Sequence, residues 1–117
     1  MKTWFCAIGA IVALSAATTY AQPQDPKVEA GQKAFVAQKC GTCHAVKGVS
    51  TGKLASALDG VGTKLKDAEI KAWLTSPAEL EAKLPKKPAM PMSTFMKTHK
   101  LTDADVDGLV AYLKSLK

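Results

Sequence analysis

The sequence of 117 residues predicts an all-α protein with a single domain. Alanine, lysine and leucine dominate, and β-branched residues are scattered, so strand signals are scarce. Apolar residues instead recur at helical spacing in three stretches, near residues 28–38, 67–76 and 102–117. Glycine, proline and polar residues punctuate the segments between them. We therefore expect short helices joined by irregular loops.

The first 21 residues are predicted to be a cleaved signal peptide. Lys2 gives a positive start, and residues 5–17 form an apolar run that is too short to prefer a membrane-spanning helix. Small residues flank Tyr20, as a signal peptidase requires, so cleavage after Ala21 leaves a mature domain of residues 22–117. Cys6 is removed with the signal. The alternative is an uncleaved membrane anchor.

The first predicted helix follows a polar lead-in at residues 22–27. Asp25 or Pro26 can begin it, because proline is tolerated in the first turn. Its shared face carries Val28, Gly31, Phe35 and Gln38, with Ala34 beside them. Gly31 lowers helix propensity, so we expect another backbone to approach closely there, unless the helix simply tolerates it.

The pentapeptide Cys40-Gly41-Thr42-Cys43-His44 follows directly and predicts a c-type haem attachment site. Each thiol adds to one haem vinyl group, which requires the two sulfurs to be close together. His44, one residue further on, can then give an imidazole nitrogen to the iron as the proximal ligand. Gly41 and Thr42 are small, which lets the macrocycle lie close to the backbone.

Two other interpretations of the cysteine pair are weaker. A zinc site needs two further ligands, and His99 is the one unused cysteine or histidine that follows the motif. A thioredoxin-like dithiol follows a strand, whereas here a helical pattern precedes the cysteines. The sequence therefore favours haem.

The middle of the chain is predicted to be a loop and then a helix. Four glycines interrupt residues 44–65, at Gly48, Gly52, Gly60 and Gly62, which indicates an irregular loop. Asp67 then opens a helix that ends at Ser76, because the residue before a proline disfavours helical geometry. Residues 77–80 can restart a short turn.

The last part of the chain combines a proline-rich segment with a final helix. Residues 85–100 contain three prolines and three methionines: Pro85, Pro88, Pro91, Met90, Met92 and Met96. Thr102 is predicted to cap the final helix, with acidic residues in its first turn and lysines at its end, as the helix dipole favours. Its apolar face consists of Val106, Leu109, Val110, Leu113 and Leu116.

The charge of the chain argues against nucleic-acid binding. The net charge is +6, and all 16 cationic residues are lysine. Nucleic-acid and phosphate recognition favours the planar arginine fork. Five lysines and no acid lie between residues 82 and 102, namely Lys83, Lys86, Lys87, Lys97 and Lys100. These lysines predict docking onto acidic patches of redox partners, and the alternative is a merely solvated loop.

The order of these motifs resembles that of class I (His/Met) monohaem cytochromes c of the bacterial periplasm, over essentially the whole mature chain. The first part of the resemblance is Gly31-x3-Phe35-x4-Cys40-x2-Cys43-His44. The others are Leu58-Asp59-Gly60-Val61-Gly62, Trp73-Leu74-Thr75-Ser76-Pro77, Met90-Pro91 and Leu109-Val110-Ala111-Tyr112-Leu113.

The resemblance implies the cytochrome c fold, in which three to five short helices wrap around one covalently bound haem c. It implies that the N- and C-terminal helices cross, with Gly31 against Tyr112. Family members usually carry proline where this chain has Ser56, and its carbonyl orients the haem histidine. Ser56 keeps a carbonyl. Trp73 is expected in the core, and the resemblance also allows its indole N–H to reach a haem propionate.

The sixth iron ligand is expected to be a methionine. Met90 lies between Pro88 and Pro91, which stiffen the backbone on both sides, and it matches the Met-Pro pair of the family. Met92 is the main alternative, followed by Met96, His99 or an open site. The methionines that are not ligands are expected to fill the core, and His99 is expected to be a solvated surface residue.

A haem with both axial positions filled predicts a soluble periplasmic electron carrier rather than an enzyme. A peroxidase of this lineage would ordinarily need a second haem motif, and the sequence has one. The alternatives are a haem sensor with a displaceable sixth ligand and an electron-transfer subunit of a larger redox enzyme. We expect a monomer without stable membrane insertion, and a reductase, oxidase or dehydrogenase as its partner.

Overall fold

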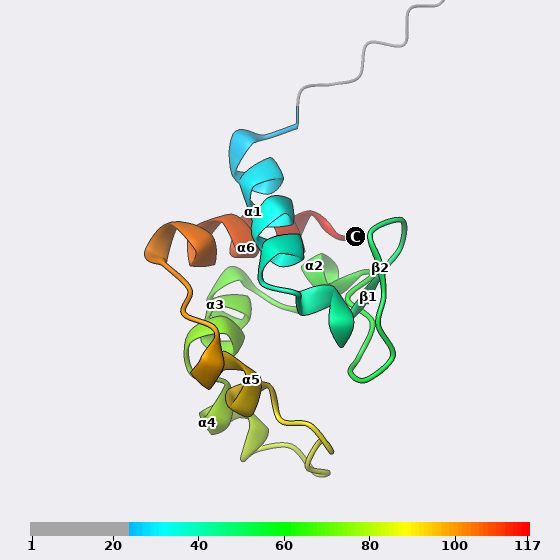
Figure 1. Ribbon diagram of the computed structural model, residues 1–117, viewed down its shortest axis with the longest axis vertical. Helices are drawn as coiled ribbons and strands as arrows, with labels where there is room; N and C mark the ends of the chain where they lie inside the picture. Colours follow the sequence, from blue (N-terminus) through cyan, green and yellow to red (C-terminus); the bar gives the residue numbers. More distant parts are fainter. Residues whose placement is uncertain (1–23) are drawn as a thin grey trace, which may run out of the picture.

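The computed structural model describes residues 24–117, which form a mostly helical domain (Figure 1). The elements in order are α1 (Pro26–Ala37), the 3₁₀ turn η1 (Cys40–Thr42), β1 (Ala45–Val46), β2 (Ser50–Thr51), α2 (Val61–Lys64), α3 (Asp67–Thr75), α4 (Pro77–Glu81), α5 (Met92–Thr98) and α6 (Asp103–Ser115). The predicted signal peptide, residues 1–21, lies outside the described residues. Its cleavage stays a prediction.

The expected all-α class is confirmed, with two differences in detail. The described part of the chain has six α-helices rather than three to five, because residues 61–64 and 92–98 form helical turns where loops were expected. The loop after His44 also contains a small antiparallel hairpin that pairs Ala45 with Thr51 and Val46 with Ser50. Gly48 has a φ of +78° at its turn, a conformation that glycine adopts without strain.

The helix ends follow the capping residues that the sequence offers. The Asp25 carboxylate accepts a hydrogen bond from the Lys27 amide at 2.9 Å, and Pro26 occupies the first turn of α1. At α6, the Thr102 hydroxyl accepts from the Asp105 amide and the Asp105 carboxylate accepts from the Thr102 amide, both at 3.1 Å. This reciprocal pair is a capping box, and it fixes the start of α6.

Helix α1 crosses α6 (Figure 1), and the two helices approach most closely at Gly31 and Gly108. A Cβ atom on Gly31 would overlap the carbonyl oxygen of Gly108 and lie 2.6 Å from Cβ of Tyr112. The expected neighbour of Gly31, Tyr112, is therefore present, but the tightest contact is with Gly108. Next to it, the rings of Phe35 and Tyr112 meet edge to face with centroids 5.7 Å apart.

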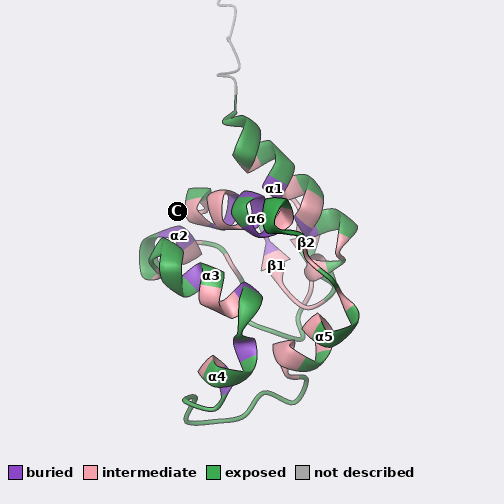
Figure 2. Cartoon of the chain, turned by 90° about the vertical axis from the view of Figure 1, so that its left-hand side faces the viewer, coloured by how far each residue is buried: buried purple, intermediate pink, exposed green. Residues whose placement is uncertain are grey.

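The buried core lies around α6 and joins α1, α3 and the hairpin (Figure 2). Its members are Phe35, Val46, Ile70, Leu74, Val106, Leu109, Tyr112 and Leu113. The Tyr112 hydroxyl is buried and has no hydrogen-bond partner among the described residues, and burial together with the charge of Asp59 raises its pKa. By contrast, the segment between α4 and α5 is exposed along residues 82–90 (Figure 2).

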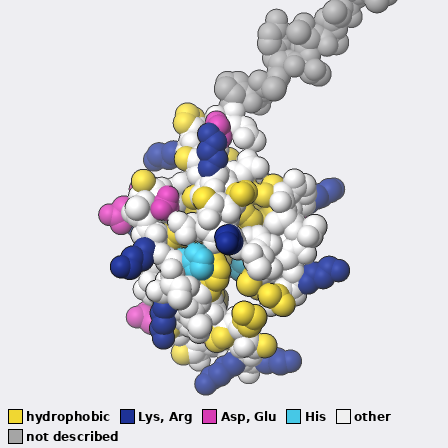
Figure 3. All heavy atoms as spheres, in the orientation of Figure 1, with side chains coloured by type: hydrophobic (Ala, Val, Ile, Leu, Met, Phe, Trp, Pro, Cys, Tyr) yellow, Lys and Arg dark blue, Asp and Glu magenta, His cyan; other side chains and the backbone are white. Residues whose placement is uncertain are grey.

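Every lysine within residues 24–117 except Lys114 is exposed. In Figure 3 most lysine side chains stand at the periphery, while hydrophobic side chains and a histidine are open to view nearer the middle of the same face. Among residues 24–117, the structure contains no helix with the length and apolar character needed to cross a membrane.

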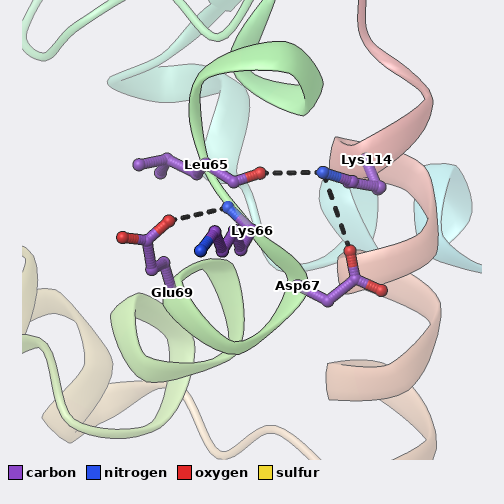
Figure 4. A network of polar contacts seen from close by, with 5 residues as sticks. All are labelled: Leu65, Lys66, Asp67, Glu69 and Lys114. Atoms are coloured by element: carbon purple, nitrogen blue, oxygen red, sulfur yellow. Dashed lines mark hydrogen bonds and ion pairs between the residues drawn. The ribbon is translucent and has the colours of Figure 1, made fainter.

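A polar network joins α3 to the end of α6 (Figure 4). The Lys114 ammonium donates to the carbonyl oxygen of Leu65 at 3.0 Å and lies 3.8 Å from the Asp67 carboxylate. The Glu69 carboxylate accepts from the Lys66 amide at 2.7 Å, which satisfies an amide at the start of α3. Because the Lys114–Asp67 ion pair is exposed, it contributes little to the free energy of unfolding.

The Gly31–Gly108 contact makes a prediction about stability. Gly31→Ala should lower the free energy of unfolding of the haem-loaded protein by roughly 1–3 kcal/mol, because the new methyl group must push α1 away from the backbone of α6. Gly108→Ala should have a smaller effect. Its Cβ would lie 3.1 Å from the nearest atom, and alanine gains up to about 1 kcal/mol in helix propensity. Urea denaturation measures both, and equal stability of Gly31→Ala and the parent protein would contradict the prediction.

Candidate functional site

The Cys40–His44 segment forms one tight turn that brings its three reactive side chains to a common cavity. Lys39 adopts a left-handed conformation with a φ of 59°, so the chain turns away from the axis of α1 just after the helix ends. The amides of Cys43 and His44 then both donate to the carbonyl oxygen of Cys40, at 3.3 and 3.1 Å. Cys40, Cys43 and His44 all line a cavity of about 390 Å³.

The hairpin supports this turn from behind. A Cβ atom on Gly52 would lie 2.5 Å from the carbonyl oxygen of Gly41, and one on Gly41 would lie 2.6 Å from Cβ of Ser50. The Ser50 hydroxyl donates to the His44 carbonyl oxygen at 2.7 Å and accepts from the Val46 amide at 3.0 Å. The small size of Gly41, expected to make room for the macrocycle, is thus also needed for packing against the hairpin.

The imidazole of His44 is held by a backbone carbonyl. Its Nδ1 lies 2.7 Å from the carbonyl oxygen of Ser56. A carbonyl oxygen only accepts hydrogen bonds, so Nδ1 must carry the proton. In the neutral ring the lone pair then resides on Nε2, the nitrogen that is free to bind a metal ion. The contact uses the main chain of Ser56, so it does not require the proline that is usual in the family.

The cleft around His44 consists of three adjoining cavities with apolar walls. His44 and Met92 line all of them, and their volumes are about 390, 80 and 470 Å³. Leu58, Val61 and Leu65 extend the wall beneath His44. Cavities of this size and character accept a large and mainly apolar ligand, with a few polar groups that orient it.

The methionines differ in how they meet this cleft. Met90 lines the two large cavities, and its residue is 62% exposed, so its side chain is not committed to the core. Met92 is half-buried and packs against the core cluster. Met96 lines the cavity of about 390 Å³ but neither of the other two. The structure thus brings both leading ligand candidates to the cleft that contains His44.

Two residues differ from what the sequence suggested. Trp73 is not a member of the buried core cluster; it is half-buried and lines two of the cavities together with His44. His99 is not a solvated surface residue. It is half-buried at the wall of the 390 Å³ cavity, its ring stacks on Phe95 at 3.7 Å, and its Nδ1 lies 2.9 Å from the Phe95 carbonyl oxygen. Stacking on Phe95 of α5 fixes the position of His99, which the neighbouring lysines in the sequence did not indicate.

The two thiols are free and partly buried, without a disulfide between them. Burial raises the pKa of the Cys40 thiol to about 11, and the nearby Cys43 contributes to the increase. Before a ligand is attached, Cys40 is therefore a neutral thiol at neutral pH. Such a group suits an apolar wall that receives a hydrophobic ligand.

A buried carboxylate beside the cleft was not predicted. Glu81 accepts hydrogen bonds from the Ser93 amide at 2.9 Å and from the Ser93 hydroxyl at 2.6 Å. Burial alone raises the pKa of Glu81, but the hydrogen bonds from Ser93 and the Met92 backbone outweigh it, and the pKa lies below its ordinary value. The sequence gives no signal for this contact, because an acid ahead of a lysine-rich segment is typical of a solvated face.

The residues around the cleft fit a covalently attached haem. Two thiols and an imidazole whose Nε2 is free to bind a metal line the same cavity, and thioether side chains line it from a different segment. Among the described residues, no group of three or more histidine, cysteine or acidic side chains could hold a metal ion by itself. A pair of thiols, an imidazole and a thioether are the donors that suit an iron with further ligands from a macrocycle.

Comparison with known proteins agrees with this geometry. The family model described as Cytochrome c matches residues 28–117, which include every site residue named above. Searches of curated proteins and of solved structures gave no match. Because the family match spans most of the chain, the protein belongs to the cytochrome c family, which has a haem-based electron-transfer role and a covalently bound haem c.

Proposed function

We propose that the protein is a periplasmic class I carrier of single electrons, with His44 and Met90 as the axial ligands of one haem c. The single observation that carries this proposal is the cleft that Cys40, Cys43, His44 and Met90 share. Bound haem supplies a one-electron couple at its iron. The chain's own residues attach the ring, hold the iron from two sides and exclude water.

His44 is assigned as the proximal ligand because its ring is already fixed in the required tautomer. The Ser56 carbonyl keeps the proton on Nδ1, so Nε2 faces the cleft with a lone pair. The Ser50 hydroxyl restrains the backbone of the same residue. A ligand restrained at both ring and backbone changes little when the iron changes oxidation state, which favours fast electron transfer.

Met90 is preferred over Met92 as the distal ligand. Met92 packs against the core, which is the role of a space-filling methionine. Met90 is largely exposed and lines both large cavities with His44, so it can move toward the iron without leaving a gap in the core. A thioether ligand favours ferrous iron and raises the reduction potential.

The remaining cleft residues have supporting roles in this proposal. Ser56 orients His44 through its carbonyl oxygen. Trp73 lines two cavities and can offer its indole N–H to a polar edge of the haem. With both axial positions filled by protein side chains, the iron has no open position for a substrate. The protein therefore acts as a carrier and not as an enzyme.

The partners are proposed to present acidic patches. The five lysines of residues 82–102 are all exposed, and none of them forms an ion pair within the described part of the chain. Lys83, Lys86 and Lys87 lie between α4 and α5, Lys97 lies on α5, and Lys100 follows α5, so all five are close in sequence to residues that line the cleft. Like charges without local counterions attract an acidic surface and orient it toward the cleft. We expect a monomeric carrier that is exported with residues 1–21 removed.

The ligand assignment makes a spectroscopic prediction. Met90→Ala should abolish the sulfur-to-iron band at the red edge of the ferric visible spectrum and lower the reduction potential, because the thioether is lost from the iron. Absorption spectra and redox titration of the purified haem protein measure both effects.

Two matched variants serve as controls. Met96→Ala should keep the band, since Met96 is not the proposed ligand. If Met92→Ala removes the band and Met90→Ala does not, Met92 is the ligand. A parent protein that lacks the band altogether, and whose ferric iron binds small ligands freely, would replace the carrier by a sensor.

The lysine-rich segment predicts salt-dependent kinetics. Electron transfer with an acidic redox partner should slow as ionic strength rises, because screening removes the attraction between the surfaces. The Lys86→Glu/Lys87→Glu variant should reduce the second-order rate constant at low salt by about tenfold. Stopped-flow mixing measures the rate.

The matched control makes the same change in net charge at a distant site. Lys27→Glu/Lys33→Glu lies on α1, at the opposite end of the molecule from the loop (Figure 1), and both lysines are exposed. This variant should alter the rate much less. Equal effects of the two pairs would show that net charge matters and not a docking surface.

A further inference from the structure

Glu81 is the one charged side chain that the structure buries, within the described residues. It is 9% exposed, at the end of α4, and it lines the cavity of about 470 Å³ together with Met90 and Met92. Burying a carboxylate is unfavourable unless its oxygens are satisfied. Here both oxygens are engaged by the same residue: one accepts from the Ser93 amide, and the other accepts from the Ser93 hydroxyl.

The segment that this contact closes has little else to hold it. Residues 82–90 are exposed throughout, and the structure assigns them no helix or strand. Within the described part of the chain, residues 85–90 form no hydrogen bond. At the N-terminal side of the segment, the amides of Lys83 and Leu84 bond to the end of α4. At the other side, the contact with Glu81 is the polar link to α4.

We propose that Glu81 is a positioning residue for the sixth iron ligand, because its carboxylate ties Ser93 to α4 and so holds the Met90–Met92 segment over His44. The inference rests on the proposed methionine ligation and adds that Glu81 controls the position of the ligand. Ser93 follows Met92 directly, so the position of its backbone limits how far either methionine can move from the cleft.

The chemistry of the contact requires a carboxylate. Two donors of one residue meet two acceptor oxygens, and hydrogen bonds to a charged acceptor are stronger than neutral ones. A glutamine amide offers one oxygen and places an N–H₂ group where a second acceptor is needed. A carboxylate can therefore hold both donors of Ser93, which the amide cannot.

The test measures how readily the distal ligand leaves the iron. In the ferric haem protein, added imidazole binds only after the methionine has moved away. Glu81→Gln should raise the imidazole-binding rate by about tenfold or more, since a charge-assisted contact is lost. Ser93→Ala keeps the amide donor but loses the hydroxyl, so it should give a smaller increase. Amide hydrogen exchange at Ser93 should become faster in both variants.

Two controls separate positioning from general effects. Glu79→Gln removes the same charge from an exposed position on α4 and should leave the imidazole rate unchanged. Val106→Ala creates a cavity in the core away from the cleft, so it lowers stability while the imidazole rate stays near that of the parent protein. A rise in this rate for Glu81→Gln beyond that of Val106→Ala supports the positioning role.

The outcomes distinguish this inference from the proposed function. If the parent protein shows the sulfur-to-iron band but Glu81→Gln and Ser93→Ala bind imidazole at the parent rate, the positioning role is wrong and methionine ligation stands. If the parent protein lacks the band, methionine ligation itself is wrong. Should Glu81→Gln fail to accumulate as folded protein, Ser93→Ala decides the question by the same rate.

Discussion

The backbone contact between Gly31 and Gly108 is the constraint on which the rest of the structure depends. With no side chain on either residue, α1 lies directly against α6, and a methyl group on Gly31 would overlap the Gly108 carbonyl. One turn further along α1, Phe35 fills the space against Tyr112 and reaches the Cys40–His44 turn, where its ring lies 3.5 Å from the Cβ position of Gly41. The crossing thus fixes where the haem-binding turn begins.

The two walls of the cleft are built with different rigidity. On the His44 side, the hairpin, the Ser50 hydroxyl and the Ser56 carbonyl restrain a turn that is already braced by the core. On the methionine side, an exposed segment depends on the contact between Glu81 and Ser93. In the proposed carrier, a fixed imidazole and a less restrained methionine segment would hold the haem from two sides. The His44 side of the cleft is thus the more restrained of the two, and the methionine side the less restrained.

Local features of the sequence predicted the elements, and contacts between distant residues account for what it missed. The bounds of α1, α3 and α6 follow from Asp25, Pro77 and Thr102, which act within a few residues of themselves. Likewise, Cys-x-x-Cys-His carries its chemistry in its spacing. Nothing near Gly108 in the sequence indicated its role, because the residue that it contacts, Gly31, lies on α1, far away in the sequence. Charged neighbours suggested solvent for His99, and nothing in the sequence singled out Glu81, whereas stacking and hydrogen bonding place both at the cleft.

The distal segment must meet two conflicting demands, and the position of Glu81 reconciles them. A proposed docking surface has to keep its lysines in water, so residues 82–90 cannot be packed against the core. The methionine proposed as the ligand in the same segment must nevertheless stay within reach of the iron. Repulsion among neighbouring lysines works against this, because like charges drive an unpacked loop to expand. Anchoring the loop at Ser93, beyond its lysine pair at residues 86–87, restrains the ligand while leaving the charged surface free. The anchor has to be buried, since solvent and salt would weaken an exposed one.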